Sequence, residues 1–384
     1  MEKIGLKIFI SAFLFWYGLG YLHPIILENS ISLEANFSIA LFFVVMVLVH
    51  GVGYASVPKH FPQKVAYRDY GVGSRSFIIL TISLFLGLSL LQFSQGTGML
   101  GYHALRVQIA LGILTFVYAL LFKGWQRTFL FLVVLAIAVY ALGTYSRRPF
   151  LTLIAPVLLV PLIRNRYNSS SKLAYGIGSS VVAIAAILYV TGLRHSGVET
   201  SLSDVVSLVL DGFRSVIVGQ GFDTVHLTQY TIDIYDSSMY VYGQTFIGGL
   251  VNFIPRAVWS EKPIAFGITL AEQYFNVARG ELFTNFGPGI VAEAYANGGF
   301  IAIVVVASLL GLLVGTADRA IENNRYDWNY VLFAVVLYPA IFFIVRGDFL
   351  NSFYEFYSKA LVIWTLCALT GLRHRLKPIY VKRL

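Results

Sequence analysis

Arginines stand out in the second half of this 384-residue chain, within a region that is otherwise strongly apolar. Arg256, Arg279 and Arg346 each lie beside a proline or glycine, at the edge of an apolar segment or between two such segments. A guanidinium group offers a planar fork of donors that binds phosphate through two hydrogen bonds, and it stays charged near lipid. Together with Arg214, these residues predict an anion site, most naturally for a lipid-linked pyrophosphate. Anchoring to lipid headgroups and pairing with nearby acids remain alternatives.

Carboxylate and imidazole groups in the same part of the chain could accept a proton from a hydroxyl group. Glu293 is the first candidate, because it lies in the apolar stretch GPGIVAEAYANGGF, where an unpaired carboxylate is costly. His195 is the second candidate. Pairing with an arginine is an equally good account of Glu293. The further candidates on the same side of the chain are His226, Glu261, Glu272, Glu281 and Asp348.

Aromatic side chains gather near these charges, and Trp259, Tyr274 and Tyr242 are the candidates for stacking on sugar rings. An interfacial aromatic belt is the alternative. The sequence shows neither an acidic pair nor a His/Cys spacing typical of metal ligands, so we expect no metal or cofactor. Arginines would then neutralise a leaving pyrophosphate, as a divalent ion does elsewhere.

The segment VNFIPRAVWSEKP, residues 251–263, carries the first of these arginines. Pro255 and Pro263 bracket it and predict a non-helical or kinked element, since proline interrupts helical hydrogen bonding. Glu261 and Lys262 are expected to form its solvated edge.

Composition identifies the elements that must position these groups. The chain is 57% hydrophobic and only 12% charged, whereas soluble domains carry about 25% charged residues. This predicts an all-α polytopic integral membrane protein. The net charge of +9 does not indicate nucleic acid, because the basic residues border apolar segments and form no basic face. The one cysteine, Cys367, lies in an apolar run and is expected to be a core residue.

A membrane-crossing helix needs about 20 mostly apolar residues. This length predicts about ten spans, the first of them an uncleaved N-terminal segment. The predicted spans are residues 6–27, 35–55, 76–94, 106–122, 128–145, 149–163, 173–193, 288–315, 329–345 and 356–372.

Basic residues in the short connections predict the orientation of these spans. One side of the membrane would carry 18 of the 28 Lys and Arg residues but only five of the 19 acids. We expect that side, which includes both termini, to be cytoplasmic. Residues 1–193 would form spans one to seven, residues 194–287 one large external loop, and residues 288–384 the last three spans and a basic tail. The loop is too apolar to be freely solvated, so we expect short interfacial or re-entrant helices within it.

Three stretches resemble a known family. FIPRAVWSEKP, GITLAEQYF and NFGPGIVAEAYANGGFIAI resemble the bacterial oligosaccharide repeat-unit polymerases of the Wzy type, which make O-antigen and exopolysaccharide. Ser260 stands where the family motif has proline, and Gly298 stands where an aromatic residue is frequent. An Arg-x10-Gly spacing, also described in that family, runs from Arg256 to Gly267.

The resemblance implies a GT-C-like membrane glycosyltransferase of the bacterial inner membrane that works without a metal. Its periplasmic reaction would transfer a glycan from undecaprenyl pyrophosphate to a new lipid-linked repeat unit, for O-antigen, capsule or exopolysaccharide. It implies roles for Arg256 and Glu293. It also implies a chain-length regulator and a flippase as partners, beside the lipid bilayer.

Three other functions remain open from the sequence. An O-antigen ligase shares the large loop and the lipid-linked donor. A transporter or flippase of lipid-linked oligosaccharides would carry charges in many spans of both halves, whereas here spans one to seven carry almost none. An acyltransferase would require a catalytic histidine, for which His195 is the only support.

Overall fold

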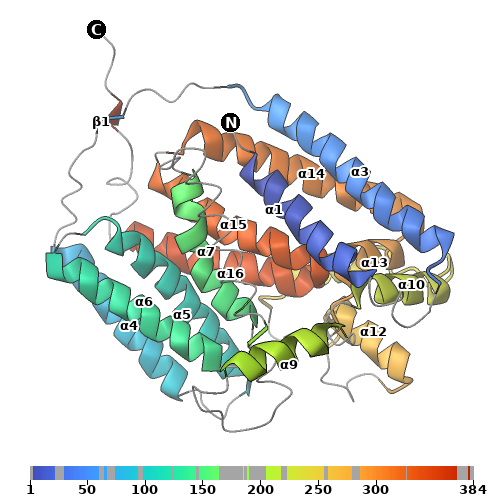
Figure 1. The fold of residues 1–384 in the computed structure, drawn as a ribbon, viewed down its shortest axis with the longest axis horizontal. Coiled ribbons are helices and arrows are strands. Elements are labelled where there is room, and N and C mark those ends of the chain that lie inside the picture. Colours follow the sequence, from blue (N-terminus) through green and yellow to red (C-terminus); the bar gives the residue numbers. More distant parts are fainter. Residues whose placement is uncertain are drawn as a thin grey trace. The chain divides into compact units, whose positions relative to one another are not determined.

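The structure, a computed structural model, describes residues 3–21, 30–59, 65–66, 74–93, 98–122, 124–143, 147–163, 185, 188–189, 205–217, 223–254, 258–278, 286–325, 327–369 and 379–380. Apart from a two-residue antiparallel ladder of β1 (Val65–Ala66) and β2 (Ile379–Tyr380), the elements in this part are helical, as the apolar patterning predicts (Figure 1).

The helices before residue 200 are α1 (Ile4–Phe13), the π-helical turn η1 (Leu14–Gly18), α3 (Leu33–Ser56), α4 (Ser74–Phe93), α5 (Gly98–Ala119), α6 (Gly124–Gly143) and α7 (Arg147–Ile163). Those after it are α9 (Val205–Ile217), α10 (Thr224–Ile234), α11 (Gln244–Leu250), α12 (Phe266–Phe275), α13 (Gly289–Ala296), α14 (Gly299–Asn323), α15 (Trp328–Arg346) and α16 (Phe349–Leu369). Four of them, α9 to α12, are the short helices expected within residues 194–287.

Three of the described helices are long and apolar enough to cross a membrane: Leu33–Ser56, Gly299–Asn323 and Trp328–Arg346. Five shorter apolar helical stretches are Ile4–Gly18, Phe77–Gly87, Ala104–Ala119, Gly124–Ala138 and Leu151–Ile163, which lie within α1 and η1, α4, α5, α6 and α7. The single span predicted at 288–315 is wrong in one respect. A turn at Asn297 and Gly298 separates the short helix α13 from the long helix α14. Glu293 on α13 therefore precedes the helix that is long enough to span. Most of the span predicted at 173–193 lies outside the described residues.

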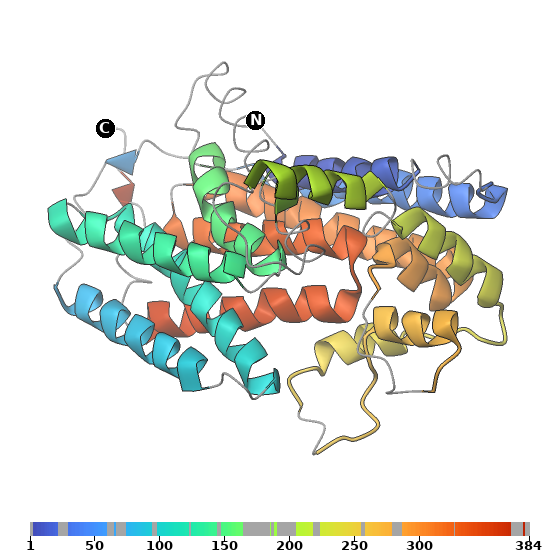
Figure 2. The ribbon, with the colours of Figure 1, turned by 60° about the horizontal axis from the view of Figure 1, so that its bottom comes forward.

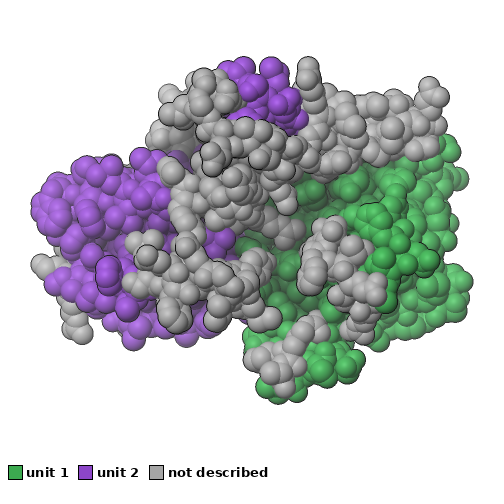
Figure 3. Space-filling model, turned by 90° about the horizontal axis from the view of Figure 1, so that it is seen from below, with its two compact units in different colours: residues 1–59, 214–320, 340–355 green, residues 60–213, 321–339, 356–384 purple. Residues whose placement is uncertain are grey.

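The chain divides into two compact units (Figure 3). Unit 1 comprises Met1–Lys59, Arg214–Ala320 and Ala340–Glu355, and unit 2 comprises His60–Phe213, Ile321–Pro339 and Phe356–Leu384. In unit 2, α5 packs against α4, α6 and α7 (Figures 1 and 2). The α5 side chains Ile109, Ile113 and Leu114 are fully buried there.

In unit 1, α3 and α14 approach closely because glycines line their contact. A Cβ atom on Gly311 would lie 2.6 Å from the Met46 carbonyl oxygen, and one on Gly315 would lie 2.3 Å from the His50 carbonyl oxygen. Gly311 and Gly315 form a Gly-x-x-x-Gly pattern, which lets two helix backbones meet in a membrane. The sequence GLLVG thus explains how α14 packs on α3.

The start of α1 is fixed to the same pair of helices by Asp318 of α14. Its two carboxylate oxygens accept hydrogen bonds from the backbone N–H groups of Gly5, at 2.8 Å, and Leu6, at 3.1 Å. The His50 Nε2 atom of α3 lies 3.0 Å from the same carboxylate. The first N–H groups of a helix lack partners within the helix, so Asp318 caps α1 from a distant part of the chain.

The other end of α3 positions α13, whose eight residues are all buried. The Tyr295 hydroxyl of α13 donates to the Glu34 carboxylate in the first turn of α3, at 2.7 Å. The Ser32 backbone N–H donates to the Gln229 side chain of α10, at 2.8 Å. Helices α3, α10 and α13 therefore form one packed group (Figure 1).

Candidate functional site

Glu293 is fully buried on α13, and its two carboxyl oxygens have different surroundings. Its Oε2 atom accepts a hydrogen bond from the backbone N–H of Phe349, at 2.6 Å. Its Oε1 atom has no hydrogen-bond partner among the described residues. Buried polar atoms are nearly always hydrogen-bonded, so an unpartnered carboxyl oxygen is a candidate for contact with a substrate.

The Asp348 carboxyl group, also fully buried, lies beside Glu293. It caps the start of α16 by accepting hydrogen bonds from the Asn351 backbone N–H, at 2.7 Å, and from the Asn351 side-chain amide, at 3.0 Å. Burial, and then the negative charge of Asp348, raises the pKa of Glu293 to about 8, although the Phe349 N–H and the Thr245 hydroxyl oppose the rise. Glu293 can therefore exchange a proton near neutral pH.

Arg346 ends α15, two residues before Asp348, and its guanidinium group lies 4.7 Å from the centre of the Trp16 ring. This is a cation–π contact. Gly287 faces the arginine. A Cβ atom there would lie 3.2 Å from the Arg346 carbonyl oxygen and 3.5 Å from its Nε atom. The first glycine of the GPG sequence thus leaves room for Arg346.

The second glycine, Gly289, begins α13 with a φ of +82°, in the region that favours glycine. A Cβ atom there would lie 2.5 Å from the Tyr17 hydroxyl, 2.7 Å from the Thr224 methyl group and 3.0 Å from the Val345 carbonyl oxygen. The Val291 N–H donates to the Tyr17 hydroxyl at 3.4 Å. Tyr17 belongs to η1, and π-helical turns are frequent at functional sites.

Asn297 joins this junction to the loop before α11. Its amide NH₂ donates to the Thr245 hydroxyl, at 2.8 Å, and to the Glu293 carbonyl oxygen, at 2.7 Å. Its amide oxygen accepts from the Gly243 N–H at 2.7 Å. The Val241 N–H also donates to the Ala296 carbonyl oxygen, at 3.0 Å. The end of α13 therefore fixes residues 241–245.

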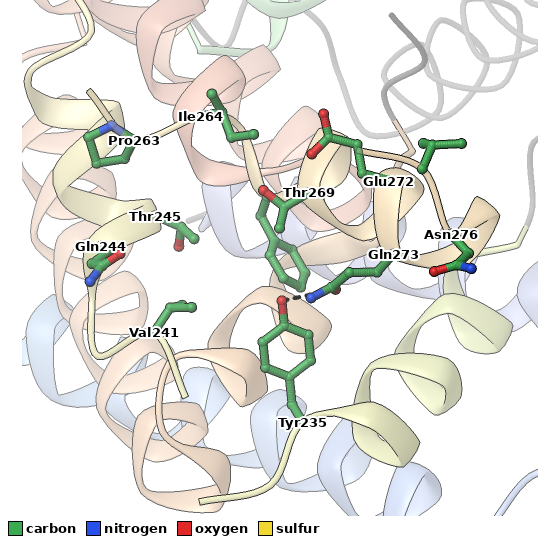
Figure 4. Close-up of a pocket in the computed structure, with 12 residues that line it drawn as sticks. Tyr235, Val241, Gln244, Thr245, Pro263, Ile264, Thr269, Glu272, Gln273 and Asn276 are labelled. Carbon is green, nitrogen blue, oxygen red and sulfur yellow. Dashed lines mark hydrogen bonds between the residues drawn. The ribbon is translucent and has the colours of Figure 1, made fainter. Parts of the chain in front are cut away.

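A cavity of about 430 Å³ opens beside these residues (Figure 4). Thr245 lines the cavity and also lies next to Glu293, so one side chain separates the two. The Tyr235 hydroxyl donates to the Gln273 side chain at 3.1 Å on another wall. The lining residues are Tyr235, Val241, Gln244, Thr245, Pro263, Ile264, Phe266, Thr269, Glu272, Gln273, Asn276 and Val277. Hydroxyl and amide groups dominate its polar surface, and they suit sugar hydroxyl groups.

Of the residues predicted from the sequence, Glu293 and Arg346 both lie at the connection between α15 and α16. Arg346 ends α15, and Glu293 accepts a hydrogen bond from the N–H of Phe349, the first residue of α16. Arg256, Arg279 and His195 lie outside the described residues, as does the side chain of Arg214 on α9. Glu272, one of the further acids, lines the cavity.

The three predicted aromatic residues do not line the cavity. Tyr242 is 71% exposed and donates from its hydroxyl to the Ser237 carbonyl oxygen, at 3.0 Å. Tyr274 belongs to an aromatic group with Tyr230, Phe275 and Phe286, and Trp259 is exposed. Tyr235 and Phe266 are the aromatic residues of the cavity wall.

The prediction that Lys262 forms a solvated edge is wrong. Its side chain is only 5% exposed, whereas Glu261 is exposed as expected. The Lys262 ammonium group donates to the carbonyl oxygens of Asn252, at 3.1 Å, and Ile254, at 2.8 Å. Composition alone cannot show that one of two adjacent charged residues is exposed and the other is buried. Among the described residues, no group of three His, Cys, Asp or Glu side chains could share a metal ion.

Helices of membrane-spanning length, together with a buried acid next to the wall of a polar cavity, are features of a helical membrane enzyme. The sequence model of the family O-antigen polysaccharide polymerase Wzy matches residues 89–374, most of the chain. The chain belongs to this family of membrane-embedded polymerases, as its motifs predict. No curated protein and no solved structure matches it.

Proposed function

We propose that this polymerase joins oligosaccharide repeat units carried on undecaprenyl pyrophosphate, at the periplasmic face of the bacterial inner membrane. It transfers the growing glycan from its lipid to the non-reducing end of a new lipid-linked repeat unit. The observation that carries the proposal is the Oε1 atom of Glu293, buried and unpartnered among the described residues, in a side chain next to Thr245 of the cavity wall.

The acceptor sugar occupies the cavity and presents one hydroxyl group to Glu293. The hydroxyl oxygen forms a bond with the anomeric carbon of the donor, and the bond from that carbon to the pyrophosphate oxygen breaks. Glu293 takes the hydroxyl proton, and the electron pair leaves with the pyrophosphate. A carboxylate with a pKa of about 8 is a stronger base than an ordinary one, and its pKa is close to the working pH.

Arginines neutralise the leaving pyrophosphate, so the transfer needs no metal. Arg346 is the arginine placed at the described junction, and Arg256, Arg279 and Arg214 act with it. His195 is the alternative base. Trp259, Tyr274 and Tyr242 stack on sugars further along the glycan, outside the cavity.

The proposed topology has about ten spans with both termini in the cytoplasm and a fold of the GT-C-like kind. Residues 1–193 form seven spans, residues 194–287 the periplasmic loop, and residues 288–384 the last three spans and the tail. A chain-length regulator and a flippase act with the polymerase.

Deletion of the gene, followed by complementation and gel analysis of the surface glycan, tests this function. The deletion strain is expected to carry glycan of single-repeat length. Arg256→Ala and Arg346→Ala should not restore polymer, and Arg256→Lys should restore it only in part, because lysine cannot bind phosphate through two parallel hydrogen bonds. Loss of all surface glycan with accumulation of lipid-linked polymer would identify a ligase instead.

Arg127→Ala is the matched control, because Arg127 also lies over an aromatic ring, 5.6 Å from the centre of Phe131. This variant should restore normal polymer. Full activity of Arg256→Ala and Arg346→Ala would contradict the pyrophosphate site.

A further inference from the structure

The wall of the cavity carries one carboxylate, Glu272, and no lysine, arginine or histidine among the described residues that line it (Figure 4). Its other polar side chains are uncharged amides and hydroxyls. A carboxylate or phosphate group of a ligand is bound most strongly by cationic side chains or by several N–H groups. The described wall offers no cation, and the Glu272 carboxylate would repel an anion. The composition of the wall therefore favours an uncharged ligand.

Three amide side chains line the cavity from two helices. Gln244 begins α11 on one side, and Gln273 and Asn276 belong to the end of α12 on the other (Figure 4). An amide offers both N–H donors and a carbonyl acceptor, and a sugar hydroxyl group also donates and accepts. Val241 and Phe266 add apolar surface, which suits the C–H faces of a sugar ring. The wall thus matches a neutral sugar in both its polar and its apolar parts.

The backbone at the end of α12 holds two of these amides in place. The Asn276 N–H donates to the Gln273 carbonyl oxygen, at 3.2 Å, and the Val277 N–H donates to the Glu272 carbonyl oxygen, at 3.0 Å. These two bonds form a Schellman motif, in which Asn276 has a φ of +52°. Asparagine adopts this left-handed conformation more readily than most residues. The sequence QYFNV therefore ends the helix at the cavity wall with a defined backbone.

Tyr235 fixes the side chain of Gln273. The tyrosine is only 3% exposed, and its ring centre lies 6.0 Å from that of Phe266. Its hydroxyl donates to the Gln273 Oε1 atom, at 3.1 Å. This bond uses the amide oxygen and leaves the NH₂ group as a donor, and no further hydrogen bond joins the Gln273 side chain to a described residue. A donor held in this way loses little conformational entropy when a ligand binds.

We propose that the cavity selects an uncharged acceptor sugar, of the hexose or N-acetylhexosamine class, to which Gln273, oriented by Tyr235, donates a hydrogen bond. The inference rests on the proposed function, in which the acceptor sugar occupies the cavity. Gln273 is then a specificity-determining residue and Tyr235 a positioning residue. Sugars that carry a carboxylate or a phosphate group are disfavoured, because they meet Glu272 without a cation to offset the repulsion.

Chemical analysis of the glycan tests the class of sugar. The deletion strain supplies glycan of single-repeat length, and the parent strain supplies polymer. Comparing their linkages by NMR identifies the sugar that becomes substituted when repeat units are joined. We expect this sugar to carry neither a carboxylate nor a phosphate group. A uronic acid or a phosphorylated sugar at that position would overturn the proposed selectivity, whereas polymer in the deletion strain would contradict the proposed function itself.

Kinetics of the full-length protein test the two side chains, with lipid-linked repeat unit extracted from the deletion strain as substrate. Gln273→Leu should raise KM about fivefold at a nearly unchanged kcat, because one neutral hydrogen bond to the substrate is lost. Tyr235→Phe keeps the ring and should raise KM about threefold. It should have no effect when added to Gln273→Leu, since residues that act together are non-additive. Gln126→Leu, the same change on α6 and outside the cavity, is the control and should keep the parental KM.

Gln273→Glu provides a second variant if Gln273→Leu does not fold. It keeps the size of the side chain and an acceptor for the Tyr235 hydroxyl, but it removes the NH₂ donor, so KM should again rise. An unchanged KM in the folded Gln273 variants, or additive effects of Tyr235→Phe and Gln273→Leu, would overturn the roles of these two residues and leave the proposed function intact. Failure of the parent protein to extend the lipid-linked repeat unit would instead contradict the proposed function.

Discussion

Two buried carboxylates of unit 1, Asp318 and Glu293, have opposite surroundings. Both oxygens of Asp318 accept hydrogen bonds, from two N–H groups that begin α1, and His50 lies against the same carboxylate. Glu293 has one N–H donor, an oxygen without a partner among the described residues, and a second carboxyl group beside it. The first arrangement stabilises a negative charge, and the second disfavours it.

The difference distinguishes a structural acid from the acid that we propose to react. The donors around Asp318 hold three helices together, α1, α3 and α14. The surroundings of Glu293 contribute little stabilisation to its charge, and such surroundings are frequent for groups that exchange a proton or bind a substrate. Burial alone, which the two acids share, does not distinguish them.

Of the substitutions that test this contrast, Glu293→Gln should have the largest effect, which is on polymer formation. The amide oxygen can still accept from the Phe349 N–H, so the fold should persist, but no proton acceptor remains. We expect polymer formation to fall by about 100-fold or more. Glycan length on gels, with Glu261→Gln at an exposed position as the control, measures this loss. Polymer of normal length from Glu293→Gln would exclude Glu293 as the base.

Gly315→Leu disrupts the contact between α3 and α14 near Asp318 without changing a charged residue. The added Cβ would lie 2.3 Å from the His50 carbonyl oxygen, so α3 and α14 must separate, at a cost of about 3 kcal/mol or more. Size-exclusion chromatography in detergent should show little folded protein. Gly51→Leu, where the added Cβ meets nothing within 4 Å, should yield normal amounts. Equal yields of the two variants would refute close helix contact at Gly315.

Asp318→Asn should destabilise the protein by about 1–3 kcal/mol, because the amide leaves one buried donor without an acceptor. Thermal unfolding of purified protein in detergent gives the size of the effect. Activity per folded molecule should stay near that of the parent chain. A well-folded but inactive Asp318→Asn protein would contradict the assignment of a purely structural role to Asp318.

The smallest effect concerns pH. The pKa of Glu293 is about 8 in the folded protein, above its ordinary value of 4.5, so the folded state retains a proton that the unfolded state has lost between these values. Its contribution to stability is fully present below pH 4.5 and falls as pH rises towards 8. Between pH 6.5 and 7.5 we expect a decrease of about 1 kcal/mol. Glu293→Gln should remove this decrease, and a persistent slope in that variant would assign it to another group.

The sequence was sufficient for the class of protein, and it singled out two residues of the candidate site, Glu293 and Arg346. Its apolar length and charge distribution predict membrane helices, and its motifs identify the Wzy family. Glu293 was predictable because a carboxylate is rare in such an apolar stretch. Arg346 was predictable because arginine at the edge of a span is unusual on the side that carries few basic residues.

The contacts that complete the site could not be predicted from local patterns. Tyr17 contacts Val291 across 274 positions of the chain, and an aromatic residue near the N-terminus gives no sign of such a partner. The end of α13 at Ala296 was missed because apolar residues lie on both sides of Asn297 and Gly298, so the whole stretch reads as one span. Lys262 was misjudged because its acceptors are backbone carbonyls, which any sequence supplies.

Gly289 has a consequence for how this chain can change over evolutionary time. Exposed apolar positions on α14, such as Leu309 and Leu313, accept almost any lipid-soluble side chain, so the spans can drift in sequence while the protein keeps working. No side chain fits at Gly289, where a Cβ would overlap the Tyr17 hydroxyl. Homologues that differ at nearly every membrane-facing position should therefore still share Gly289, which makes it a marker for aligning distant members.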